Sequence, residues 1–274
     1  MEHVVIIGNG IAGATAARHI RKLNSDVRIS MISEETDYFF SRTALMYVFM
    51  GHMKFEHTQP YENDFWSKNR LDLVRDKVVS VNQEKKELSL QMGGTMTYDK
   101  LLLATGSSPN KFGWPGQDLK GVQGLYSKQD LDRLEEYSAT TERAVIVGGG
   151  LIGIELAEML HTRNIPVTML VREKSFWSSV LPPEESDMIN RHIREHHIDL
   201  QLGKELEEIL SDENGRVKAI KTKDGEEIAC QLVGLTVGVH PNVDFLKDSG
   251  IEMDKGILVN HQLETNIPGI YAAG

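Results

Sequence analysis

The sequence predicts an α/β protein made of two Rossmann-like, three-layer dinucleotide-binding domains. Two glycine-rich fingerprints start 140 positions apart, at Gly8 and Gly148, and each stands between a short apolar run and a helical pattern. The chain has 274 residues, which suits two domains of the usual ~100–200 residues. Two complete strand–turn–helix–strand units imply two nucleotide sites, rather than one site used twice.

The first unit begins at the N-terminus. Residues 4–7 form a β-branched apolar run that predicts a buried strand, residues 14–23 predict a helix, and residues 27–32 predict a second strand. The run G-N-G-I-A-G fills positions 8–13 between the first strand and the helix. Its glycines permit a tight turn, a close approach to a pyrophosphate and helix packing, in that order. The phosphates would lie at the helix N-terminus, where free N–H groups favour an anion.

An acidic residue is expected at the end of the second strand, where it would accept a hydrogen bond from a ribose hydroxyl. Glu34 and Glu35 both stand there. We favour Glu34 as the ribose ligand.

The second unit repeats this order over residues 144–171, with G-G-G-L-I-G at positions 148–153. The end of its second strand is different, because Val171 occupies the place of the expected acid and Arg172 follows. A guanidinium group matches the 2′-phosphate of NADP, but Glu173 could serve a ribose, and Arg172 could simply cap a strand end at the surface. The pattern favours NADP(H) slightly and leaves NAD(H) open.

Composition excludes several classes of function. The formal net charge of −10 argues against binding to nucleic acid. No stretch approaches the ~20 apolar residues of a membrane span, and the N-terminal residues do not form a signal peptide.

A single cysteine, Cys230, rules out an internal disulfide, which fits a cytoplasmic protein. We expect Cys230 to be a small core residue. His192 and His196 have the i, i+4 spacing of metal ligands but no evident third ligand, so we predict no metal site.

Four further motifs accompany the fingerprints: A-T-G-S at 104–107, G-I-E at 153–155, G-V-H-P-N at 238–242 and T-N-I-P-G-I-Y-A-A-G at 265–274. With them the whole chain resembles the FAD-dependent pyridine nucleotide–disulfide oxidoreductase-like superfamily. The resemblance is greatest to its members without a redox dithiol, which include ferredoxin and rubredoxin reductases and the flavin module of nitrite reductase.

The resemblance implies a nested domain organisation. Residues 1–115 and 240–274 would form a discontinuous FAD-binding domain, and residues 116–239 an inserted NAD(P)-binding domain. Because relatives continue with an aspartate and an interface domain, the chain is expected to be truncated after Gly274.

The resemblance also implies site residues. The expected FAD contacts are Gly8, Gly10, Ala12, Gly13, Glu34, Arg42, Val78, Ala104, Thr105 and Gly106. The expected contacts with the nicotinamide nucleotide are Gly148, Gly150, Ile152, Gly153, Glu155, Arg172 and Gly238. Glu155 would face the nicotinamide side of the flavin. Tyr47 stands where relatives carry a lysine that pairs with this glutamate, and it cannot supply a fixed positive charge.

The implied function is an FAD-dependent oxidoreductase that takes a hydride from NAD(P)H and passes electrons to another acceptor. That acceptor could be an iron–sulfur or rubredoxin-type protein, a fused domain, a quinone or oxygen. The alternative is a nucleotide-responsive flavoprotein with a signalling role, like apoptosis-inducing factor. A homodimer is compatible with either function.

Overall fold

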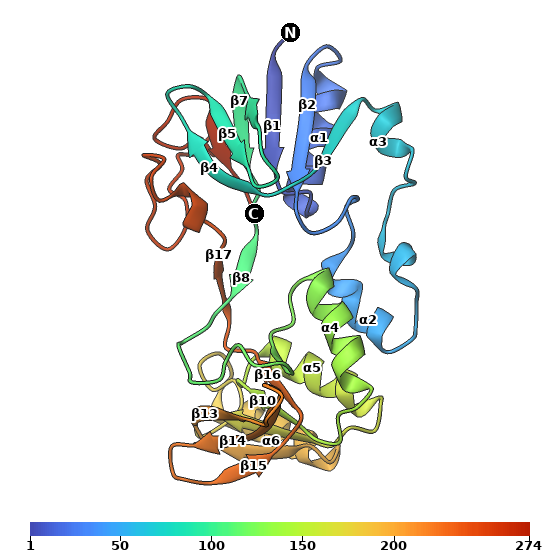
Figure 1. Cartoon of the computed structure of the whole chain (residues 1–274), viewed down its shortest axis with the longest axis vertical. Coiled ribbons are helices and arrows are strands. Elements are labelled where there is room, and N and C mark those ends of the chain that lie inside the picture. Colours follow the sequence, from blue (N-terminus) through green and yellow to red (C-terminus); the bar gives the residue numbers. More distant parts are fainter. The chain divides into compact units, whose positions relative to one another are not determined.

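The computed structural model describes all residues, 1–274, and divides into two compact units (Figure 1). The first unit comprises Met1–Arg42, Lys54–Ser108 and His240–Gly274. The second comprises Thr43–Met53 and Pro109–Val239. Each unit has its own parallel five-stranded sheet, so the expected pair of α/β domains is confirmed.

The sheet of the first unit joins both ends of the chain. Its strands, in spatial order, are β18 (Ile270–Ala272), β7 (Lys100–Leu103), β1 (His3–Ile7), β2 (Arg28–Ser33) and β3 (Leu71–Arg75). All neighbouring pairs are parallel. The C-terminal strand β18 therefore lies beside β7, one strand away from the N-terminal strand β1.

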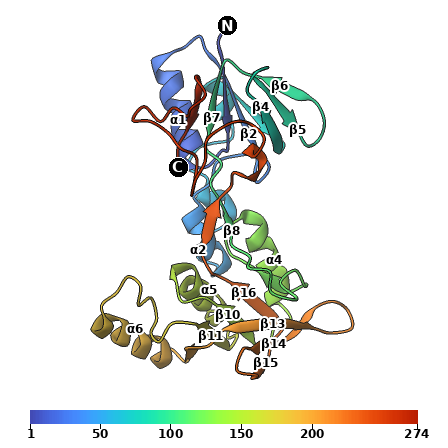
Figure 2. The same cartoon turned by 90° about the vertical axis from the view of Figure 1, so that its left-hand side faces the viewer.

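Two apolar layers cover this sheet because side chains alternate between its faces. Val4 and Ile6 of β1 pack towards α1 (Ile11–Leu23) and α3 (Phe65–Lys68). Val5 and Ile7 pack towards an antiparallel meander of β4 (Val78–Asn82), β5 (Glu87–Leu90) and β6 (Thr95–Thr97). Figure 2 shows α1 and the meander on opposite sides of the sheet. Short 3₁₀ turns lie at Arg42–Ala44, Phe55–Thr58 and Asp244–Leu246.

The second unit repeats the Rossmann arrangement. Its sheet runs in the order β12 (Asp199–Leu202), β11 (Val167–Val171), β10 (Ala144–Val147), β16 (Leu232–Leu235) and β9 (Val122–Gln123). Its helices are α2 (Leu45–Phe49), α4 (Lys128–Ser138), α5 (Leu151–His161) and α6 (Pro183–Glu195). An antiparallel sheet of β13 (Leu206–Ser211), β14 (Val217–Thr222) and β15 (Glu227–Ala229) completes it.

Cys230 lies between β15 and β16 and is fully buried in the core shared by the two sheets of this unit. Burial raises the pKa of its thiol to about 12. The residue is therefore a small core side chain, as expected.

The chain passes between the units along two paired segments, β8 (Ser107–Pro109) and β17 (Val239–Pro241). The second crossing coincides with the expected boundary at residue 240, whereas the first comes earlier than residue 115. Residues 109–115 join the second unit because Trp114 packs on its core. Residues 43–53, which were expected in the first domain, also belong to the second unit.

Candidate functional site

In the glycine turn of the first unit, two of the three glycines stand where no side chain fits. Gly8 has a φ of +107°, and a Cβ atom on it would lie 2.1 Å from the carbonyl oxygen of Ala104. A Cβ on Gly13 would lie 2.0 Å from the carbonyl oxygen of Gly8. A Cβ on Gly10 would meet nothing within 4 Å. Gly8 and Gly13 therefore permit packing, while Gly10 faces open space that a ligand can enter.

The start of α1 offers free backbone donors beside Gly10. Gly10 is the N-cap and has no side chain to cap the first turn, which also contains no acidic residue. The unpaired N–H groups and the positive end of the helix dipole favour an anion at this point. At the far end of the sequence, Gly274 approaches the same turn, with its ideal Cβ position 3.6 Å from the Cβ of Ala12. The A-A-G segment and the fingerprint thus meet within one unit.

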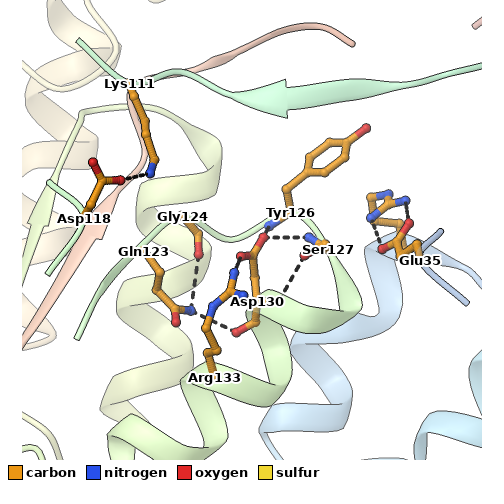
Figure 3. Close-up of polar contacts among 10 residues, drawn as sticks. Glu35, Lys111, Asp118, Gln123, Gly124, Tyr126, Ser127, Asp130 and Arg133 are labelled. Atoms are coloured by element: carbon orange, nitrogen blue, oxygen red, sulfur yellow. Dashed lines mark hydrogen bonds and ion pairs between the residues drawn. The ribbon is translucent and has the colours of Figure 1, made fainter. Parts of the chain in front are cut away.

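The two glutamates after β2 have different partners. Glu34 forms an ion pair with Lys77 at 3.1 Å and remains 51% exposed. Glu35 accepts two hydrogen bonds from Arg42, at 2.8 and 2.6 Å, and is only 17% exposed (Figure 3). The structure therefore leaves Glu34 accessible, whereas Glu35 holds and orients Arg42.

The second glycine turn has the same construction. Gly148 has a φ of +128°, and its Cβ would lie 2.4 Å from the carbonyl oxygen of Thr236. A Cβ on Gly153 would lie 2.7 Å from the carbonyl oxygen of Gly148, while Gly150 faces open space. Thr236 also donates a hydrogen bond from its hydroxyl to Val147. This residue was not expected in the site, and the internal repeat could have revealed it, because it follows β16 as Ala104 follows β7.

The end of β11 is apolar inside and charged outside. Val171 is fully buried, and a Cβ on Gly149 would lie 2.7 Å from its side chain. Arg172 is 77% exposed, and its Nε donates to Glu173 at 2.7 Å. The hydrogen bond to Glu173 raises the pKa of Arg172. No carboxylate occupies the Val171 position, and the exposed Arg172 is partly neutralised by its neighbour.

The two residues expected near the reaction centre lie in the second unit, on helices that pack against each other. Glu155 is on the exposed side of α5, where partial desolvation and the charge of Glu158 raise its pKa. Tyr47 is on α2, which packs on α4 and α5, and its ring is 44% exposed and stacks on His52. Tyr47 makes no hydrogen bond to Glu155, so this chain lacks the pairing implied for its relatives.

A capping network fixes the start of α4, the helix against which α2 packs. The carboxylate of Asp130 accepts hydrogen bonds from the backbone N–H groups of Tyr126 and Ser127, at 2.9 and 2.8 Å. The Ser127 hydroxyl accepts one from the N–H of Asp130, which completes a capping box. Asp130 also pairs with Arg133, and Gln123 donates to the carbonyl oxygen of Asp130 (Figure 3).

The remaining expected cofactor contacts are placed by these turns and strands. Ala104, Thr105 and Gly106 follow β7, Val78 is buried at the start of β4, Ile152 lies in the first turn of α5, and Gly238 precedes β17 with a φ of +90°.

His192 and His196 lie side by side on α6, with ring centroids 4.4 Å apart, and no group of three His, Cys, Asp or Glu side chains is placed to hold a metal ion. No helix has the length and apolar character needed to cross a membrane.

Comparison with known proteins identifies the family. The model of the pyridine nucleotide-disulphide oxidoreductase family matches residues 2–274. The chain is 30% identical to a nitrite reductase [NAD(P)H] of Bacillus subtilis, over all of this chain and 34% of the relative. It is also 30% identical to a rubredoxin-NAD(+) reductase of Acinetobacter baylyi, over all of this chain and 72% of that protein.

A solved structure of a ferredoxin reductase from Rhodopseudomonas palustris matches with a TM-score of 0.93 and 27% identity, covering 100% of this chain and 68% of the other. The chain thus spans between a third and about three quarters of these proteins. It belongs to the pyridine nucleotide-disulphide oxidoreductase family.

Proposed function

We propose that the first unit binds FAD, that the second binds NAD(P)H, and that the chain passes a hydride from the nucleotide to the flavin. The observation that carries this proposal is that the same cofactor cradle occurs in both units. Each cradle consists of a glycine turn, residues 8–13 or 148–153, and the N-terminus of the helix that follows it. In each unit the middle glycine faces open space at an uncapped helix N-terminus, which suits a pyrophosphate. A bound FAD would supply the redox chemistry, and the protein would supply binding, orientation and electrostatics.

In the first unit, the backbone around Gly10 and Ala12 would hold the FAD pyrophosphate, and Glu34 would accept from the ribose. Glu34 suits this role because it is half-exposed and its ion pair with Lys77 is open to solvent. Arg42 would add a positive charge, already oriented by Glu35. Ala104, Thr105, Gly106 and Val78 complete the proposed FAD contacts.

In the second unit, the turn at Gly148, Gly150, Ile152 and Gly153 would hold the nucleotide pyrophosphate. Gly238 would also contact the nucleotide. Glu155 would orient the reacting face of the nicotinamide. Partial desolvation and the charge of Glu158 raise its pKa. Tyr47 would border the same region as a neutral group in place of a lysine.

The nucleotide preference follows from the end of β11. The buried Val171 offers nothing to a 2′-hydroxyl, and the exposed Arg172 can reach a 2′-phosphate. We therefore propose a slight preference for NADPH, which is limited because Glu173 already binds the guanidinium.

Electrons would leave the flavin for a separate acceptor. The only cysteine is buried and has a pKa of about 12, so no thiol pair of this chain can carry them. The relatives include reductases named for rubredoxin and ferredoxin. We propose a small electron-carrier protein or a fused domain as the acceptor.

Anaerobic titration of the FAD-loaded, full-length protein tests the hydride step. Addition of NADPH or NADH should bleach the flavin absorption band, with NADPH effective at the lower concentration. Dithionite serves as the control that the flavin is reducible. Bleaching by dithionite but by neither nucleotide would refute the proposed function.

A further inference from the structure

Arg163 connects three helices of the second unit. It follows α5, and its Nη2 donates to the carbonyl oxygen of Phe49 at 2.8 Å and to the Glu135 carboxylate at 2.7 Å. Its Nη1 donates to the Ser138 hydroxyl at 3.0 Å. The guanidinium carbon lies 3.6 Å from the centroid of the Phe49 ring. One side chain therefore joins α2 to α4 at the end of α5.

The helix α2 depends on such external support. It has five residues, far fewer than the ~12–15 that an isolated helix needs in water. Leu45 and Phe49, one turn apart, bury its inner face, with exposed fractions of 3% and 2%. The Phe49 carbonyl belongs to the last turn, where helix carbonyls lack intrahelical partners, and a cation there also complements the helix dipole.

The orientation of Tyr47 follows from the contacts of Arg163 with Phe49, which we call the α2 anchor. Tyr47 is two residues before Phe49 and so points about 200° around the helix from it. It is exposed where Phe49 is buried. The next turn continues the arrangement, because the N–H of His52 donates to the Tyr47 carbonyl at 2.9 Å and the two rings stack. A rotation or loosening of α2 would therefore displace the Tyr47 ring without changing its chemistry.

We infer that Arg163 is a positioning residue that fixes α2, and with it Tyr47, to the NAD(P)-binding unit. The inference rests on the proposed function in one respect, namely that Tyr47 borders the reaction centre. Lysine cannot replace Arg163 in this role. Only the planar guanidinium can donate in two directions while its face lies on an aromatic ring.

Hydrogen exchange tests the anchor itself in the FAD-loaded, full-length protein. In Arg163→Gln, amides of residues 43–53 should exchange about tenfold faster, because a charge-assisted hydrogen bond of at least ~1.4 kcal/mol is lost. Peptides covering β10 and β11 should be unchanged. Arg163→Lys should resemble Arg163→Gln, and Arg191→Gln, at an exposed position on α6, should resemble the parent. Parent-like exchange of residues 43–53 in Arg163→Gln would overturn the inference.

Kinetic coupling tests the role in positioning. Arg163→Gln should slow flavin reduction by NAD(P)H several-fold, with the dissociation constant of the nucleotide unchanged. In a Tyr47→Ala background, the same substitution should have little further effect, because the group that it positions is already gone. Equal slowing in both backgrounds would show a purely structural role and overturn the inference.

Glu135→Gln provides a second variant if Arg163→Gln fails to fold, since it removes one partner of the guanidinium and should reproduce both effects in weaker form. If the parent flavin is not reduced by either nucleotide, the proposed function fails, but the exchange measurement still decides whether Arg163 anchors α2.

Discussion

If Arg172 lies beside the 2′ position of the nucleotide, as proposed, its ion pair with Glu173 should limit nucleotide selectivity. The pair is at the surface, with exposed fractions of 77% and 37%, so water and salt screen the attraction between the two charges. A 2′-phosphate can therefore compete with Glu173 for the guanidinium. Selectivity for NADPH should therefore be positive but small.

Removing the charge of Arg172 and removing the charge of Glu173 should shift the preference for NADPH over NADH in opposite directions. Arg172→Gln should weaken NADP⁺ binding by about tenfold and leave NAD⁺ binding nearly unchanged, because the charge-assisted hydrogen bond to the 2′-phosphate is lost. Glu173→Gln should strengthen NADP⁺ binding up to about fivefold. Dissociation constants at fixed salt measure both effects, with Lys218→Gln, on β14, as a charge control. A stronger NAD⁺ preference in Glu173→Gln would contradict this account.

Glu155, a proposed site residue, should lower the stability of the protein at neutral pH. Its pKa is raised by desolvation and by Glu158, so the folded state binds a proton more tightly than the unfolded state. The stability contributed by this group is complete below the unfolded pKa and is lost as the pH rises through the folded pKa.

Glu155→Gln should therefore stabilise the protein at pH 7 and have little effect at pH values below the ordinary glutamate pKa. Urea unfolding across this range measures the difference, which should be modest because the group lies at the surface. The same variant should reduce the flavin more slowly with NAD(P)H if Glu155 orients the nicotinamide. A larger stabilisation by Glu155→Gln at low pH than at neutral pH would refute the sign of the pKa shift.

At the scale of elements, the sequence predicted both Rossmann units because glycine turns, strands and small-residue helices are local patterns. It could not assign α2. Residues 43–53 lie between parts of the first domain, and five helical residues carry no signal for the core on which they pack. The unit on which α2 packs is determined by contacts of Leu45, Phe49 and Arg163. Arg163 is 114 positions from Phe49 in the sequence. The partners of Glu34 and Glu35 were equally hidden, because adjacent carboxylates are distinguished only by side-chain geometry.

The three glycines of each turn should differ sharply in their tolerance of alanine. Gly8→Ala places a Cβ 2.1 Å from the carbonyl oxygen of Ala104 and adds strain at positive φ, so it should cost roughly 2 kcal/mol or more. Gly10→Ala meets nothing and should change the stability of the FAD-free protein by no more than about 0.5 kcal/mol. Urea unfolding of the FAD-free variants would compare them, and equal destabilisation would contradict the steric account.

At the scale of the molecule, the two units are variations of one construction with different residues at the same points. Ala104 and Thr236 contact the first glycine of the respective turns, and Glu34 and Arg172 directly follow the second strands. The order of the motifs along the chain predicts a nested arrangement with a boundary at residue 115, whereas residues 109–115 lie in the second unit, where Trp114 packs on the core.

The central claim is that the two cradles hold different cofactors, and a reciprocal pair of valine substitutions tests it most directly. Gly10 and Gly150 both have backbone angles that valine can adopt, and both face open space. Gly10→Val should fold but lose FAD. Gly150→Val should keep FAD, remain reducible by dithionite and no longer be bleached by NADPH or NADH. Retention of FAD by Gly10→Val, or its loss from Gly150→Val, would contradict the assignment of the two units.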